Sequence, residues 1–151
     1  MPSNAPFLLV EGNADDCSLI ERAFHDAPPY VRFQRLSDCE EAMAYLEGEG
    51  PYTDRKKYPL PKVVLLDLDF TMPGSFAFLK WLRADKRNNH RLLPTLVISS
   101  SAEPRDINYA YELGTNAYLT KPADYQDFTE QLRALALFWG KFAEIPQLSE
   151  P

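Results

Sequence analysis

Four short apolar runs in this chain each end in a polar or charged residue, and no other feature restricts its fold as strongly. The runs are Leu9-Val10-Glu11, Leu66-Asp67, Ile98-Ser99-Ser100 and Thr120-Lys121-Pro122. If they are parallel strands of one sheet, their carboxyl ends lie along one edge, where open α/β sheets place their functional residues. We therefore expect Glu11, Asp67, Ser99 and Lys121 to meet in one site. Two carboxylates, a hydroxyl and a lysine suit a site that receives a phosphoryl group.

Segments with helical spacing of apolar residues separate and follow the expected strands, so that a β-α unit is repeated five times. The expected strands are residues 6–10, 31–36, 63–66, 95–98 and 117–120. Alternation of this kind predicts a doubly wound α/β fold: a five-stranded parallel sheet, five helices on its two faces and right-handed crossovers. The pattern by itself leaves the strand order open. A helix from about Pro104 to Leu113 is expected to end at Gly114, and Asp15 or Asp16 and Ser37 or Asp38 are the expected caps of the first two helices.

The length of 151 residues is consistent with one domain that has room for a hydrophobic core. We expect a single domain over residues 1–151, with a long polar surface loop at about 49–61. An extended C-terminal helix and tail are expected at about 124–151. The sequence shows no internal repeat that would argue for a second unit.

Composition excludes several classes of protein. The net charge of −6 argues against nucleic-acid binding. No apolar run approaches the ~20 residues of a membrane span, and no basic segment precedes an apolar core at the N-terminus. The two cysteines, Cys17 and Cys39, lack the spacing of a metal site. We therefore expect reduced thiols in a cytoplasmic protein that contacts neither a membrane nor nucleic acid.

The residues around the four strand ends carry a family resemblance. The segments are Leu8–Asn13, Val64–Asp69, Leu96–Ser100 and, most specifically, Ala110–Pro122. With them the chain resembles the receiver domain of two-component response regulators over nearly its whole length. The resemblance implies the flavodoxin-like strand order 2-1-3-4-5 and a phosphoacceptor signalling protein, which is not an enzyme acting on a separate substrate.

Two further segments are similar to one subgroup, the single-domain regulators that partner phytochrome-type histidine kinases. They are the insert from Gly48 to Pro61 and the tail with Leu137–Trp139 and Ile145-Pro146. This resemblance implies a sensor histidine kinase as the partner and a homodimer that forms through the C-terminal segment. The downstream target is a protein that the sequence does not identify.

The resemblance also implies a role for each site residue. Asp67 is expected to accept the phosphoryl group, with Asp69 as the competing candidate because Asp69–Pro73 imitates the family's D-x-x-M-P pattern. Lys121 would pair with Asp67 and then with the phosphoryl oxygens, and the following Lys121–Pro122 peptide is expected to be cis. Ser99 would be the switch hydroxyl and Tyr118 its aromatic partner.

Gly12 departs from the family pattern, which has an acidic magnesium ligand at this position. Glu11, Asp67 and a backbone carbonyl at Asp69 are left as the expected Mg²⁺ ligands, because Mg²⁺ prefers oxygen and keeps several waters. Whether the Asp69 carboxylate compensates or repels the phosphoryl group stays open. Asp15 and Asp16 are a third source of a carboxylate, although both are more typical of helix caps.

Two alternatives follow from these observations. If Gly12 weakens Mg²⁺ binding too far, the chain is a pseudo-receiver, a binding module that is not usefully phosphorylated. An enzyme of another flavodoxin-like family is the weaker alternative. It would need a glycine-rich nucleotide loop, a nucleophile elbow or a His-containing triad, and the sequence has none of these.

Overall fold

The central element is a five-stranded parallel sheet in the order β2-β1-β3-β4-β5, as expected. The computed structural model describes residues 5–26, 28–67, 74–84 and 89–148. The strands are β1 (Phe7–Val10), β2 (Phe33–Leu36), β3 (Val63–Asp67), β4 (Thr95–Ser99) and β5 (Ala117–Thr120). Each lies within one or two residues of its predicted bounds. For β1, β3 and β4 the reason is that apolar runs without alternation are typical of strands buried on both faces.

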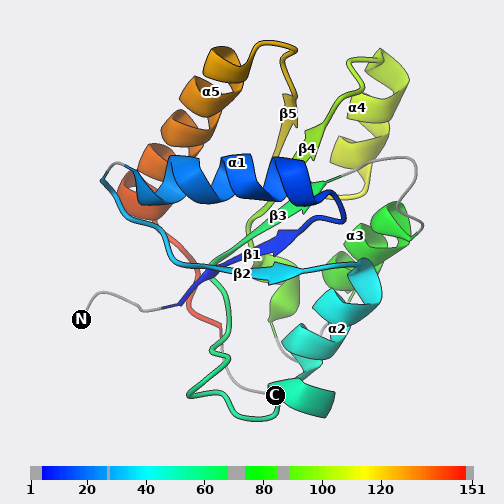
Figure 1. The fold of residues 1–151 in the computed structure, drawn as a ribbon. Coiled ribbons are helices and arrows are strands. Elements are labelled where there is room, and N and C mark those ends of the chain that lie inside the picture. Colours follow the sequence, from blue (N-terminus) through cyan, green and yellow to red (C-terminus); the bar gives the residue numbers. More distant parts are fainter. Residues whose placement is uncertain (1–4, 27, 68–73, 85–88, 149–151) are drawn as a thin grey trace.

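Helices cover both faces of this sheet. They are α1 (Ala14–His25), α2 (Cys39–Glu47), α3 (Ser75–Ala84), α4 (Pro104–Glu112) and α5 (Tyr125–Leu137), with the shorter η1 (Gly50–Tyr52), η2 (His90–Leu92) and η3 (Phe138–Phe142). Figure 1 shows α1 and α5 together on one face and α2, α3 and α4 on the other. None of the helices in the described ranges has both the length and the apolar character that crossing a bilayer requires.

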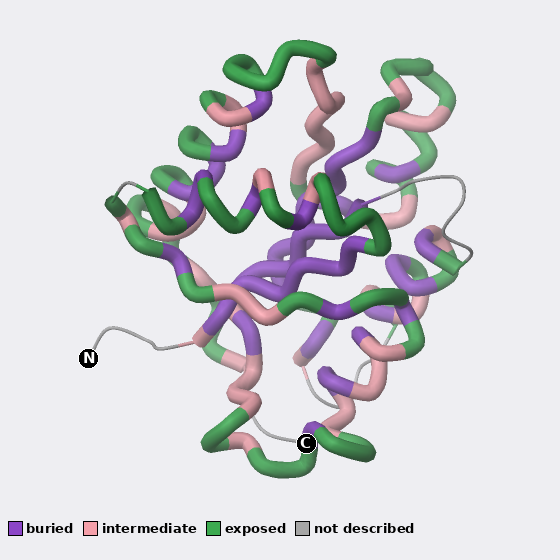
Figure 2. Tube along the Cα trace, viewed as in Figure 1, coloured by how far each residue is buried: buried purple, intermediate pink, exposed green. Residues whose placement is uncertain are grey.

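Alternate residues of the strands build two separate cores. In β1, Phe7 and Leu9 pack with α1 and α5, whereas Leu8 and Val10 pack with α2, α3 and α4. Successive side chains of a strand point to opposite faces of the sheet, so a strand buried on both sides must be apolar throughout. The central strands are accordingly buried along their length, as the purple segments of Figure 2 show.

The first helix begins earlier than the sequence suggested. Asn13, and neither Asp15 nor Asp16, is its N-cap: the Asn13 side chain accepts hydrogen bonds from the backbone N–H groups of both aspartates. Asp38 caps α2 as predicted. Because Asn13 takes the cap, Asp15 and Asp16 belong to the first turn of the helix, where their carboxylates also favour the helix dipole.

The segment at 49–61, expected as a polar surface loop, also packs some of its side chains onto α2. Tyr52 is buried, and its ring and that of Tyr58 pack against Tyr45 of α2. The Arg55 guanidinium donates hydrogen bonds to the carbonyls of Tyr45 and Leu46 at the end of α2. Helix-end carbonyls need such donors from outside the helix, and Arg55 supplements the bond that the Tyr45 carbonyl already accepts from the Gly48 N–H. The segment therefore covers the end of α2.

Gly114 positions the start of β5 and hence the approach to Lys121. It has a φ of 105°, and a Cβ built there would lie 2.7 Å from Cγ of Arg83. The Arg83 guanidinium donates to the carbonyls of Gly114 and Leu93 and to Oδ1 of Asn116, each at 2.8 Å. Arg83 thereby ties α3 to both ends of the α4–β5 connection, and a side chain at Gly114 would displace it.

We expect Gly114→Ala to lower the free energy of unfolding by about 2–5 kcal/mol, since a positive φ and a steric clash add. Gly50→Ala is the matched control: its φ is 60° and its Cβ would meet nothing within 4 Å. The control should lose only about 1–2 kcal/mol from backbone strain. Urea denaturation measures both values, and equal losses would contradict the role given to Arg83.

Candidate functional site

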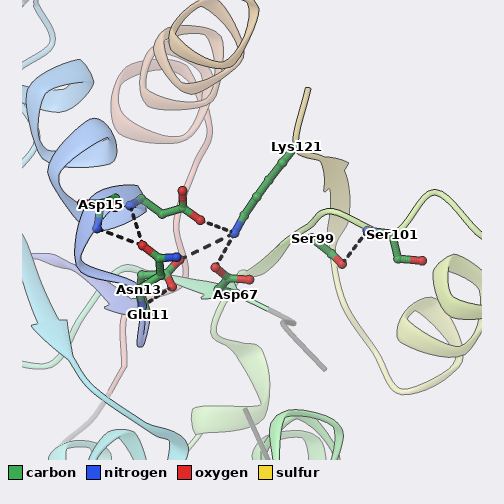
Figure 3. Close-up of polar contacts among 8 residues, drawn as sticks. Glu11, Asn13, Asp15, Asp67, Ser99, Ser101 and Lys121 are labelled. Carbon is green, nitrogen blue, oxygen red and sulfur yellow. Dashed lines mark hydrogen bonds and ion pairs between the residues drawn. The ribbon is translucent and has the colours of Figure 1, made fainter. Parts of the chain in front are cut away.

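The four predicted residues do meet at the carboxyl edge of the sheet. Glu11 directly follows β1, Asp67 is the last residue of β3, Ser99 is the last residue of β4, and Lys121 directly follows β5. Glu11, Asp67 and Ser99 are almost completely buried, at 1%, 3% and 1% exposure. Figure 3 shows the Lys121 side chain reaching back across the edge to Asp67. The parallel register therefore brings the strand ends together as the sequence predicted.

Lys121 is held by carboxylates. Its Nζ lies 2.5 Å from Oδ2 of Asp67, 2.6 Å from Oδ2 of Asp16 and 3.9 Å from Oε2 of Glu11. Burial by itself would lower the pKa of Lys121, but the bonds to Asp16 and Asp67 outweigh it and raise the pKa. The side chain is therefore a fixed ammonium group. The peptide that follows it is trans, so the expected cis Lys121–Pro122 bond was wrong; among the described residues only Pro28–Pro29 is cis.

Asp16 is the site residue for which the sequence gave only a weak signal. Its place in the first turn of α1 follows from the Asn13 cap. The Cα–Cβ bonds of a helix tilt towards its N-terminus, and α1 begins beside the end of β1. The Asp16 side chain therefore reaches the carboxyl edge of the sheet, where it contacts Lys121.

Glu11 is a buried acid whose pKa is strongly raised. Its Oε1 accepts a hydrogen bond from the Asn13 N–H at 2.8 Å, and its own N–H donates to the carbonyl of Leu36 at 3.0 Å. Burial raises the pKa of Glu11 to about 8, and the neighbouring Asp67 adds to the effect. Two carboxylate oxygens in the site, Glu11 Oε2 and Asp67 Oδ1, have no hydrogen-bond partner among the described residues.

These carboxylates fit a divalent cation. One oxygen each from Glu11, Asp16 and Asp67 lies within 4.8 Å of the other two. Hard cations such as Mg²⁺ take oxygen ligands of this kind, and a cation would give Glu11 Oε2 the partner that it lacks among the described residues. Asp69, the third expected ligand and the competing phosphoacceptor, lies outside the described residues.

Ser99 and Tyr118 meet at the loop between β4 and α4. Ser99 Oγ accepts a hydrogen bond from the Ser101 N–H at 3.1 Å, and the Tyr118 hydroxyl donates to the Ser101 carbonyl at 2.8 Å. Ser101 Oγ in turn donates to Oδ2 of Asp106 in the first turn of α4 at 2.7 Å. Ser101 is thus the residue through which Ser99, Tyr118 and α4 are connected, and the sequence reasoning had not singled it out.

The raised pKa of Glu11 has a consequence for stability. Between its ordinary value of 4.5 and about 8, folded Glu11 keeps a proton that the unfolded chain has lost. The folded state then binds more protons, so the free energy of unfolding must fall as pH rises through this window. Denaturation in EDTA between pH 5 and 8.5 should show this slope in the wild type and a flatter one in Glu11→Gln, which cannot titrate. Parallel curves would contradict it.

Comparison with known proteins gives one consistent result. No protein-family model matches the chain. It is 31% identical over 135 residues to the probable methanogenesis regulatory protein FilR2 of Methanothrix harundinacea, and the match covers 87% of this chain and 81% of FilR2. It is 27% identical over 146 residues to the response regulator Rcp1 of Synechocystis sp., covering 95% of this chain and 96% of Rcp1.

Solved structures agree with this. The response regulator RPA3017, described in red light signaling of R. palustris, superposes with a TM-score of 0.87 at 31% identity, covering 95% of this chain and 99% of that chain. The phosphorylated cyanobacterial phytochrome response regulator RcpA gives 0.85 at 29% identity, over 96% and 100% of the two chains. The Mn²⁺-bound form of Rcp1 gives 0.83 at 26% identity, over 95% and 99%.

Both kinds of likeness extend over most of the chain and over most of each relative, so they describe the whole receiver fold and not a shared fragment. The sheet order and the carboxylates gathered around Lys121 agree with them. This chain therefore belongs to the response-regulator family of two-component signalling proteins, and among them it is similar to stand-alone, phytochrome-linked members.

Proposed function

We propose that Asp67 accepts a phosphoryl group from the phosphohistidine of a sensor histidine kinase, and that this kinase is of the phytochrome type. The supporting observation is the state of the Asp67 carboxylate. It is buried at the end of β3, Lys121 Nζ lies 2.5 Å from its Oδ2, and its Oδ1 has no hydrogen-bond partner in the part of the chain that the structure describes. A carboxylate that is oriented on one oxygen and unengaged on the other is suited to act as a nucleophile.

The proposed transfer exchanges one bond to phosphorus for another. Oδ1 of Asp67 attacks phosphorus, an O–P bond forms, the N–P bond of the phosphohistidine breaks, and the imidazole nitrogen keeps the electron pair. The product is an acyl phosphate. The Lys121 ammonium then pairs with the phosphoryl oxygens as a point charge. A bound Mg²⁺ would neutralise charge on the transferring group. Glu11 and Asp67 would hold it, together with the Asp69 carbonyl that the sequence suggested.

The phosphoryl group is proposed to act through protein contacts, with no separate substrate and no nucleic acid. The net charge of −6 supports this, and the cytoplasm is the compartment we expect. A homodimer through the C-terminal segment is supported by its exposed aromatic rings, since Phe138 is 53% and Phe142 61% exposed. Exposed aromatics of this size are typical of protein interfaces.

Ser99 and Tyr118 are proposed to carry the signal from Asp67 to the surface. Ser99 Oγ accepts the Ser101 N–H, and a hydroxyl can instead donate to a phosphoryl oxygen. If Ser99 turns towards a phosphoryl group on Asp67, the bond to Ser101 breaks and the β4–α4 loop moves. Tyr118 holds the same loop through the Ser101 carbonyl, so it senses that movement directly.

Phosphorylation by acetyl phosphate with Mg²⁺ tests the acceptor. We expect intact mass to detect a single phosphoryl adduct in the wild type and none in Asp67→Asn, because the nucleophile is lost. Asp69→Asn is the matched control, since it removes the other candidate carboxylate. An adduct that disappears only in Asp69→Asn would assign the acceptor to Asp69, and no adduct in the wild type would favour the pseudo-receiver.

Hydrogen exchange tests the connection at Ser101. Tyr118→Phe removes the hydroxyl that donates to the Ser101 carbonyl, so the amide hydrogens of residues 100–103 should exchange faster even without phosphorylation. Tyr111→Phe, an exposed tyrosine of α4, is the control and should leave this exchange unchanged. If both variants match the wild type, Tyr118 does not restrain the β4–α4 loop.

A further inference from the structure

Asp16 brings a carboxylate into the cluster with Glu11 and Asp67, to which Gly12 contributes none. Gly12 directly follows Glu11 and is exposed, and Asp16 lies one helical turn further along the chain. The Asn13 cap fixes the first turn of α1 by accepting from the Asp15 and Asp16 N–H groups at 2.9 and 3.1 Å. The Asp16 carboxylate is thereby held at the mouth of the site, where its side chain is 25% exposed.

Three acidic side chains, those of Glu11, Asp16 and Asp67, surround the Lys121 ammonium group. Burying a polar atom without a hydrogen-bond partner is costly. Glu11 Oε2 has no such partner among the described residues, and Glu11 is more than nine-tenths buried. This is an independent sign that the three acids are arranged around a cation.

We infer that Asp16 is the metal-binding carboxylate that replaces the acid absent at residue 12, so that Mg²⁺ is held by Glu11, Asp16 and Asp67. The inference rests on the proposed function, because it gives a ligand to the metal that assists transfer to Asp67. The replacing ligand, the Asp16 carboxylate, comes from helix α1 and not from the end of β1. The present contact between Asp16 and Lys121 at 2.6 Å means that Lys121 and the cation draw on the same carboxylate.

A metal-binding experiment without any phosphodonor tests this. The free Mn²⁺ signal in electron paramagnetic resonance reports Mn²⁺ binding directly, and displacement by Mg²⁺ gives the affinity for Mg²⁺. We expect Asp16→Asn to weaken both affinities on the order of 10- to 100-fold, the range known even for losing a residue that only supports a ligand. Asp15→Asn is the matched control: it removes the same charge one residue away but lies outside the cluster of three acids.

Restoring an acid at residue 12 is the decisive variant. Gly12 is not among the described glycines with positive φ, so an aspartate there meets no backbone restriction of that kind. Gly12→Asp combined with Asp16→Asn should recover most of the lost affinity, because a carboxylate at residue 12 would take over from that of Asp16. Circular dichroism checks that each variant is folded.

The outcomes separate this inference from the proposed function. If Asp16→Asn and Asp15→Asn bind Mn²⁺ as tightly as the wild type, or if both weaken it equally, the inference is overturned while transfer to Asp67 stands. If the double variant binds no better than Asp16→Asn, the replacement of residue 12 is refuted. If the wild type binds no Mn²⁺ at all, both the inference and the metal-assisted transfer fail.

Discussion

The ion pair between Lys121 and Asp67 is the contact on which the arrangement of this site depends. It joins the end of β5 to the end of β3, across β4, and the same ammonium group reaches Asp16 of α1. A buried pair of this kind stabilises the fold only while both partners are present, because removal of one leaves an uncompensated charge. The charged side chains of the site therefore hold the carboxyl edge of the sheet together. Any group that binds there must replace interactions that Lys121 already makes.

Contacts elsewhere in the fold place Lys121 within reach of Asp67. Arg83 fixes the carbonyl of Gly114 at the start of β5, and the four residues of β5 are paired with β4 up to Thr120. The Lys121 N–H then donates to the Ser99 carbonyl at 2.7 Å. Because Ser99 lies on the same strand end as the loop that Tyr118 holds, a change at Asp67 has a short path to the α4 surface. The path consists of hydrogen bonds that can exchange partners, which is what a switch requires.

Gly12 changes which residues supply carboxylates to the site, but the site still contains three of them. Residue 12 contributes no carboxylate, but the first turn of α1 brings that of Asp16 into one cluster with Glu11 and Asp67. The two acids are not equivalent, because Asp16 is also bonded to Lys121. If Asp16 also binds the cation, as we infer, metal binding and the position of Lys121 are linked. The pseudo-receiver alternative would follow if the Asp16 carboxylate could not serve both.

The sequence alone determined the sheet, its two-sided burial and the meeting of Glu11, Asp67, Ser99 and Lys121, because each depends on local runs of residues and on parallel strands ending at one edge. It did not determine which residue caps α1. Neighbouring residues on a helix differ by about 100° in direction, so choosing Asn13 instead of Asp15 or Asp16 decides whether an aspartate faces the site. The sequence alone also could not predict the hydrogen bonds of Ser101 or the packing of residues 49–61 onto α2. They depend on side chains from segments that only the tertiary structure brings into contact.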